Sequence, residues 1–200
     1  MAVADILVGP INLWYSPVGT ALPSINTVAV GAAFGAGWVS PGTTLVPLSM
    51  SYEAEELDVE VEQYPSPITR ARTKETLVLE TQLAEYTALN LKTAFAGTGA
   101  ITTVAAGASV HASDSYSFGG DILLPQLQWG FETWVLDASS NKLPKRVFIY
   151  KATALLGGKL EFSKKSALGV PLKINALVDT GKAAGAQLMI FQIATGWKTS

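Results

Sequence analysis

The clearest pattern in the chain begins shortly after residue 53, where apolar and acidic residues alternate. Every second residue from Leu57 to Val61 is apolar, and acids fill the positions between them. The sequence QYPSP interrupts this alternation, which resumes at Thr69 and continues to about Leu83. A period of two residues is typical of a β-strand with one buried face. The pattern therefore predicts a long hairpin over about residues 53–80. Its expected tip consists of Tyr64, Pro65, Ser66 and Pro67.

The two arms of this hairpin carry opposite charges. Six of the chain's 16 acids lie between Glu53 and Glu62, and three bases occupy every second position from Arg70 to Lys74. If the turn is centred on Pro65, three acids face three bases across the strands, which stabilises a hairpin modestly. The predicted pairs of this charge ladder are Glu60 with Arg70, Asp58 with Arg72, and Glu56 with Lys74. Three acids then remain in surplus: Glu53, Glu55 and Glu62.

A helical period follows the second arm. Apolar Ala84, Ala88, Leu91 and Phe95 recur at intervals of four, three and four residues, as on one face of a helix. Gly97 stands where a glycine commonly ends a helix. The spacing predicts one α-helix over about residues 84–96.

The rest of the chain reads as short strands between turn signals. Alternation recurs in the segments 125–137, 145–156, 159–164, 169–179 and 187–194. In the first of these, Trp129 falls on the apolar face, and Gln128 and Glu132 fall on the polar face. Many short strands and one helix predict a mainly β protein, an antiparallel β-sandwich with one flanking α-helix. The sandwich would also carry the projecting hairpin and extended arms.

Residues 1–200 are expected to form a single domain of this kind. Glycine and proline punctuate the first fifty residues, so a long helix is excluded there. Residues 1–10 are expected to form an N-terminal arm. Residues 98–121 are rich in glycine, serine and alanine, and we expect a long loop with marginal strand.

The composition is unusual for a soluble monomer because the chain has few charged residues. Hydrophobic residues make up 48% and charged residues 15%, and no charge occurs between Ile6 and Tyr52. Such a chain either enters a membrane or covers much of its surface with other subunits. The longest apolar stretch, residues 28–39, is too short for a spanning helix. We therefore expect no membrane insertion. The absence of cysteine fits assembly in a reducing compartment.

Charge is also divided along the chain. Residues 1–100 carry ten acids and four bases, whereas residues 101–200 carry six acids and ten bases. One face of a subunit could therefore attract a different face of its neighbour, and such head-to-tail contacts form rings or filaments. The alternative is that charged residues from both halves of the chain lie together on one surface. The uneven distribution of charge along the sequence would then have no consequence for assembly.

Candidate chemistry is sparse. Carboxylates crowd residues 53–62, but strand alternation places them in one exposed row instead of across a cleft. His111 is the only histidine, and we expect it to be exposed in a loop. With one histidine and no cysteine we expect no zinc site, and no phosphate-binding loop has the required spacing. No catalytic, metal or cofactor-binding residues are predicted, and the chain is not expected to be an enzyme or to need a cofactor.

Several segments resemble the major tail (tail tube) proteins of long-tailed bacteriophages. The order is LWYSPVGTALPS, a strand entering the acidic hairpin, TRARTKETLVLETQLAEYTALNLKTAFAG, and finally KLEFSKKSALGVPLKINALVD. The similarity extends over most of the chain, but its motifs are diffuse. Its strongest part is the strand–hairpin–strand–helix order over 50–97, followed by the late strands at 145–194.

This resemblance implies a β-sandwich that assembles into hexameric rings, which stack into a tube. The tube would enclose the tape-measure protein, meet tail-end and baseplate or tip proteins, and conduct DNA without binding it specifically. Assembly would take place in the host bacterial cytoplasm, and the product would belong to the virion tail. The surplus acids Glu53, Glu55 and Glu62 are candidates for an acidic lumen that repels DNA. The tip residues are candidates for an inter-subunit contact.

Two other functions remain open at this point. A related ring or shell protein, such as a secretion-system tube, a tail terminator or a capsid decoration protein, would share the need for subunit contacts. A carbohydrate-binding β-sandwich would instead present exposed aromatic residues on a concave face and stay monomeric.

Overall fold

The computed structural model describes residues 10–60, 62–64, 66–137, 139–164 and 167–197. These residues form a mainly β protein with antiparallel, sandwich-like packing and one short helix, so the predicted fold class is confirmed. The expected N-terminal arm lies outside the described residues except for Pro10. Val61 and Pro65 of the expected hairpin also lie outside them.

Seven antiparallel strands form one sheet in the order β1-β6-β7-β8-β3-β2, and β9 also pairs with β7. The strands are β1 (Asn12–Pro17), β2 (Thr44–Val59), β3 (Thr69–Leu83), β6 (Gln126–Leu136), β7 (Lys142–Leu156), β8 (Val170–Ala176) and β9 (Met189–Ile193). One edge of β7 pairs with β6. Its other edge pairs with β9 over Lys145–Ile149 and with β8 over Ala152–Leu156. Because β7 pairs with two strands along the same edge, the sheet divides there and curls into two layers.

The core lies between the two halves of this curled sheet. Leu13 of β1 and Trp129 of β6 belong to the same buried cluster as Leu79 of β3 and Ile174 of β8. These pairs come from opposite ends of the strand order, so the sheet must fold over itself to bring them together. Burying such side chains stabilises a fold by roughly 1.5–3 kcal/mol each.

Strand alternation is confirmed most clearly in β8. Val170, Leu172 and Ile174 are fully buried in the core, whereas Lys173 between them remains partly exposed and pairs with Glu80 of β3. In β3 the alternation continues, with Leu77, Leu79 and Leu83 buried. The period-two pattern therefore identified the buried face of both strands.

The polar face predicted for β6 is covered by another part of the chain. Gln128 and Glu132 are both buried, although they alternate with the core residue Trp129 as expected. The cause is the segment 18–43, which covers this second face. Phe34 and Trp38 from that segment pack against Phe148 of β7 in a second apolar cluster. This N-terminal segment is therefore ordered on its own subunit.

The helix is shorter than the sequence predicts. Helix α1 spans Ala88–Ala94, because Thr87 caps it by accepting a hydrogen bond from the Asn90 amide, 3.1 Å away. Ala84 instead donates to the Thr43 carbonyl and remains tied to the sheet. At the other end the predicted cap at Gly97 is also displaced. Phe95 is the C-cap, and Ala96 takes the left-handed conformation, with φ of 52°, that a glycine usually occupies.

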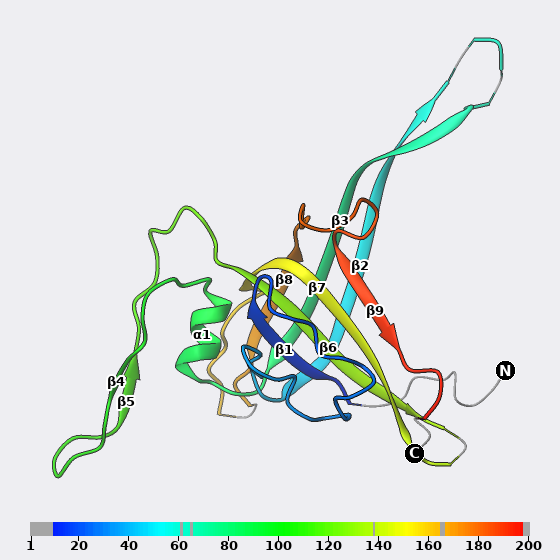
Figure 1. Ribbon diagram of the computed structural model, residues 1–200. Helices are drawn as coiled ribbons and strands as arrows, with labels where there is room; N and C mark the ends of the chain where they lie inside the picture. Colours follow the sequence, from blue (N-terminus) through cyan, green and yellow to red (C-terminus); the bar gives the residue numbers. More distant parts are fainter. Residues whose placement is uncertain (1–9, 61, 65, 138, 165–166, 198–200) are drawn as a thin grey trace.

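Residues 98–121 are mostly irregular, as the sequence predicted, and their marginal strand forms a second, small hairpin. Strands β4 (Thr102–Val104) and β5 (Ser113–Ser115) pair with each other in a separate small sheet. Figure 1 shows this β4–β5 hairpin beside α1, on the side of the molecule away from β9. His111 is exposed near its tip, as expected.

Candidate assembly surface

The β2–β3 hairpin extends well beyond the core. β2 has 16 residues and β3 has 15, and their distal ends point away from the rest of the sheet (Figure 1). Every residue from Thr69 to Glu75 is exposed, and so is every residue from Ser49 to Val59. The projecting hairpin predicted from the alternation is confirmed. Neither face of its outer half has a partner among the described residues, which is unusual because an isolated two-stranded hairpin is marginally stable in water.

The predicted register of the charge ladder is wrong by two residues at its outer end. Asp58, not Glu60, lies opposite Arg70. Glu56 lies opposite Arg72, and Lys74 lies opposite Glu55. Glu60 lies beyond the last pair of the ladder, in the connection between the strands. The ladder thus uses five of the six predicted residues and gains Glu55.

Two features of the backbone cause this shift. The strands end at Val59 and Thr69, so the connection is centred one residue before Pro65, and the Ile68 amide donates to the Val59 carbonyl to close it. In addition, Thr73 has no partner in the register and forms a β-bulge, and its hydroxyl donates to the Glu55 carbonyl at 3.1 Å. Alternation alone cannot reveal a bulge, because it leaves the residue types unchanged.

The ladder contains two close cross-strand ion pairs. Arg70 Nε lies 2.8 Å from Asp58 Oδ1, and Lys74 Nζ lies 2.8 Å from Glu55 Oε1. The hydrogen bond and charge of Glu55 raise the pKa of Lys74. All four side chains are exposed, so the pairs fix register more than they add stability.

Arg72 forms its ion pair along the strand with Glu75, which also accepts a hydrogen bond from the Tyr52 hydroxyl at 3.0 Å. The hydrogen bond from Arg72, followed by that from Tyr52, lowers the pKa of Glu75. The Arg72 guanidinium also lies 6.0 Å from the centre of the Tyr52 ring. Strand β2 is thereby joined to β3 at the base of the projecting hairpin.

The corrected register changes which acids are in surplus. Glu55 is paired with Lys74, so it is no longer an unpaired candidate for an acidic lumen. Glu53 lies with Glu80 and Lys173 around a polar hollow of about 350 Å³ on the outer face of β2 and β3. Glu60 and Glu62 lie in the exposed connection. That Glu53 and Glu62 line a lumen stays a prediction, and Glu60, which leaves the ladder, joins the unpaired acids.

The hairpin tip is exposed where it is described. Tyr64 has 64% of its surface exposed, and Ser66 and Pro67 are exposed as well, while Pro65 lies outside the described residues. A large aromatic side chain left this open is typical of a contact residue. Whether the tip contacts another subunit stays a prediction.

The outer edges of β2 and β9 have no strand partner within the described part of the chain. There β2 pairs only with β3, and β9 pairs only with β7. Both strands carry exposed apolar side chains. They are Leu45, Val46, Met50, Tyr52, Leu57 and Val59 on β2, and Phe191 and Ile193 on β9. Long apolar edges of this kind pair with other chains unless they are protected.

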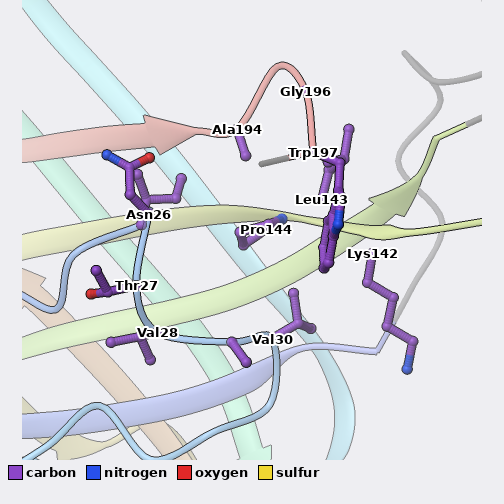
Figure 2. A pocket seen from close by; sticks show the side chains of 12 residues that line it. Asn26, Thr27, Val28, Val30, Lys142, Leu143, Pro144, Ala194, Gly196 and Trp197 are labelled. Atoms are coloured by element: carbon purple, nitrogen blue, oxygen red, sulfur yellow. The ribbon is translucent and has the colours of Figure 1, made fainter. Parts of the chain in front are cut away.

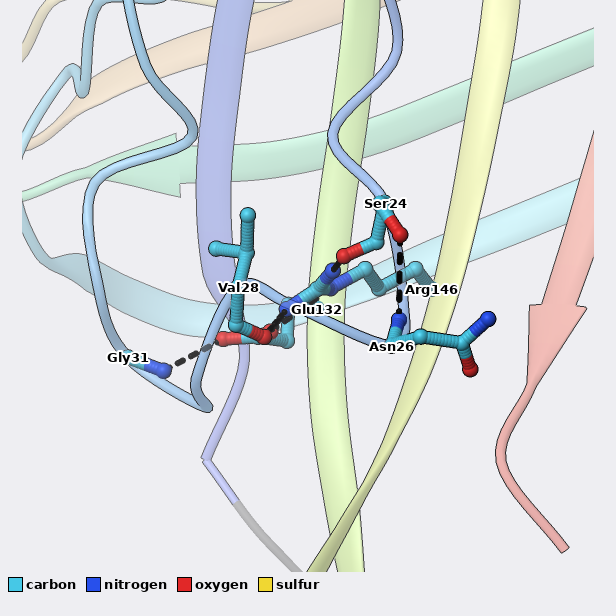
Figure 3. A network of polar contacts seen from close by, with 6 residues as sticks. All are labelled: Ser24, Asn26, Val28, Gly31, Glu132 and Arg146. Atoms are coloured by element: carbon cyan, nitrogen blue, oxygen red, sulfur yellow. Dashed lines mark hydrogen bonds and ion pairs between the residues drawn. The ribbon is translucent and has the colours of Figure 1, made fainter. Parts of the chain in front are cut away.

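A buried ion pair that sequence reasoning missed holds the N-terminal segment in place. Arg146 of β7 and Glu132 of β6 lie opposite each other, and neither side chain is exposed. Arg146 Nε donates to Glu132 Oε1 at 2.8 Å, and its terminal nitrogens donate to the Ser24 and Val28 carbonyls. Glu132 also accepts from the Gly31 amide at 2.6 Å (Figure 3). Every charge is thus matched inside an enclosed network.

Signals for this network are present in the sequence. The two β-strands that carry Glu132 and Arg146 each have an apolar core face, so both residues belong to the second face. The long uncharged segment before residue 52 could have been read as the cover of that face. A buried pair of this kind has no access to substrate, so its role is structural.

An apolar pocket of about 470 Å³ lies where the N-terminal segment meets the β6–β7 turn and the residues after β9. We call it the Trp197 pocket. Figure 2 shows Asn26, Thr27 and Val28 on one side of it and Leu143 and Trp197 on the other. The residues that line it include no carboxylate and no histidine, and Lys142 is their one charged side chain.

The described residues offer neither a cluster of metal ligands nor a helix that could span a membrane. In the described ranges, no three acidic or histidine side chains come close enough to hold a metal ion. The helical part of those ranges is also too short and insufficiently apolar to cross a membrane. Comparison with known proteins adds no family: no protein-family model matches the chain, and no curated protein matches it.

Proposed function

We propose that this chain is a structural subunit that assembles with copies of itself into stacked rings, forming the tail tube of a long-tailed bacteriophage. The observation that carries the proposal is the free edge of β2. Sixteen residues of strand, apolar at several exposed positions, pair on one side only among the described residues. A soluble monomer rarely tolerates such an edge, whereas a ring covers it with the next subunit.

The projecting hairpin supports the same proposal. The outer half of the hairpin has no core of its own. Its register is nevertheless defined by a β-bulge, by ion pairs and by a side-chain hydrogen bond. A segment that is this well defined and this exposed gains its stability from a partner. In a stacked tube, a hairpin of this length would contact a neighbouring subunit in its own ring or in the next one.

The proposed tube encloses the tape-measure protein and later conducts DNA. A conduit must not retain its cargo, and each cationic contact with phosphate would add affinity by counterion release. The acids Glu53, Glu60 and Glu62, which have no base opposite them in the register, would instead repel phosphate. The sequence resemblance to tail tube proteins adds two further features to this proposal. The rings would be hexameric, and the tube would contact tail-end and baseplate or tip proteins.

Sedimentation of the purified protein tests the proposal. The unmodified chain is expected to form large assemblies whose amount increases with concentration. Leu57→Lys, on the exposed hairpin, is expected to fold normally and to abolish these assemblies, because Leu57 is 58% exposed and makes no core contact. Val18→Lys is a matched control at another exposed apolar position. Equal assembly by Leu57→Lys and the unmodified chain would contradict the proposed role of β2.

A further inference from the structure

Three consecutive apolar residues project from the connection between β5 and β6. Ile122 is 94% exposed and Leu123 is 84% exposed, and Leu124 follows them at 36%. We call these residues the 122–124 loop. Adjacent apolar side chains this open to water are costly, so a partner that buries them would gain substantial free energy.

The loop is held outward by its flanks. Gly119 and Gly120 both have positive φ, 111° and 83°, which few other residues adopt, and they turn the chain just before the loop. The carboxylate of Asp121 accepts a hydrogen bond from Thr98 Oγ1 at 2.6 Å. On the other side, Pro125 lines a pocket together with residues of helix α1 and leads directly into the paired strand β6. Because the loop is fixed at both ends, less conformational freedom is lost when it binds.

The Trp197 pocket has the size and chemistry to receive this loop. A cavity of about 150 Å³ already encloses a six-carbon ring. The 470 Å³ of the Trp197 pocket therefore accommodate the two four-carbon side chains of Ile122 and Leu123. Its walls are mostly apolar, with Val28, Leu143 and Trp197 exposing carbon to the space (Figure 2).

The loop of one chain cannot reach the pocket of the same chain. The loop precedes the first residue of β6, whereas the pocket residues Lys142, Leu143 and Pro144 pair with the last three residues of that strand. Eleven residues of extended strand separate them, roughly 35 Å at about 3.3 Å per residue. Figure 1 shows the β5–β6 connection and the end of β9 on opposite sides of the molecule.

Charge favours the same pairing. Lys142 lines the pocket, and Lys145 donates to the carbonyl of Ala194 at its edge, 3.0 Å away. Asp121 immediately precedes the loop. Docking would bring this carboxylate toward the two ammonium groups, and such complementarity selects one orientation over others.

We propose that the 122–124 loop of one copy inserts into the Trp197 pocket of the next copy. Donor and acceptor lie on opposite ends of the subunit, so the contact is head-to-tail and closes into a ring if the rotation between copies permits. The inference rests on the proposed self-assembly and assigns to it a specific contact.

Cross-linking between copies tests this contact directly, because the chain has no cysteine. Two single-cysteine proteins are prepared, Leu123→Cys in the loop and Ala29→Cys at the exposed rim of the pocket. A short bismaleimide should link a mixture of the two into dimers, while each protein alone should give little. Leu123→Cys mixed with Ala183→Cys, at an exposed site elsewhere, is the matched control. The double variant Ala29→Cys/Leu123→Cys should give a ladder of higher oligomers.

The outcomes separate this contact from assembly itself. Assemblies that form without a cross-link between positions 29 and 123 would overturn the contact and leave the proposed function intact. A protein that stays monomeric at every concentration would overturn both. A cross-link from Ala29→Cys to Ala2→Cys, in place of Leu123→Cys, would show that the N-terminal residues fill the pocket, and would also overturn the contact.

A substitution gives an independent measurement. Leu123→Asp leaves the core untouched, because Leu123 is almost fully exposed. It should raise the concentration needed for assembly at least about tenfold, the loss expected when one large apolar side chain no longer enters a pocket. Leu123→Met, which keeps an apolar side chain, should assemble almost normally. Unchanged assembly by Leu123→Asp would overturn the contact.

Discussion

Arg146 and Glu132 face each other from neighbouring strands, with no part of either side chain exposed to solvent. Their remaining hydrogen-bonding groups bind the backbone of residues 24–31, so the pair fastens the uncharged N-terminal segment to the sheet. Removing one member leaves the other as an unpaired buried charge. We expect Glu132→Ala to lower the free energy of unfolding by about 3–5 kcal/mol.

Urea unfolding of the protein, kept below its assembly concentration, measures this effect. Glu161→Ala removes an exposed carboxylate and is the control, with an expected change within about 0.5 kcal/mol. Similar stabilities of Glu132→Ala and Glu161→Ala would show that the buried pair does not hold the segment.

The register of the β2–β3 hairpin makes a prediction about charge reversal. Arg70→Glu places two like charges opposite each other, because Asp58 is the partner of Arg70. Asp58→Lys should restore the pair and with it the protection of the hairpin amides against hydrogen exchange. Glu60→Lys should not restore it, since Glu60 lies beyond the ladder. Rescue by Glu60→Lys instead would support the register predicted from a turn centred on Pro65.

Glu75 should make the base of the hairpin sensitive to acid. Hydrogen bonds from Arg72 and Tyr52 lower its pKa below the ordinary value of 4.5. A lowered pKa in the folded state means that these contacts are complete above the unfolded pKa and are lost as the pH falls through the folded one. An NMR titration of the Glu75 carboxyl should therefore show a midpoint below 4.5. In Arg72→Gln the midpoint should move upward, and an unchanged midpoint would contradict the assigned ion pair.

The short helix depends on its N-cap residue, Thr87. The Thr87 hydroxyl accepts the hydrogen bond of the Asn90 amide, so Thr87→Ala should lower the free energy of unfolding by about 1 kcal/mol. Thr87→Ser keeps the acceptor and should be close to neutral. Equal losses in both variants would mean that the threonine methyl, and not the cap, stabilises this turn.

Some features of this fold could be predicted from the sequence, and others could not. Alternation located the buried face of β8 through Leu172 and Ile174, and it located the projecting hairpin. The same signal was misleading at Glu132, because a strand face can be covered by a segment distant in the sequence. The predicted register of the β2–β3 hairpin was wrong partly because of Thr73, where a bulge changes the pairing of the strands but not the residue types. The helix began late because Thr87 caps it, although apolar spacing starts at Ala84.

Self-assembly into a hollow tube is the central claim, and electron microscopy of the purified protein tests it most directly. Negative-stain images of the concentrated protein should show stacked rings or tubes with a central channel. The same preparation of Leu57→Lys should show isolated subunits, which ties the tubes to the exposed β2 strand. Closed rings that never stack would contradict the tail-tube proposal, and monomers at every concentration would contradict self-assembly altogether.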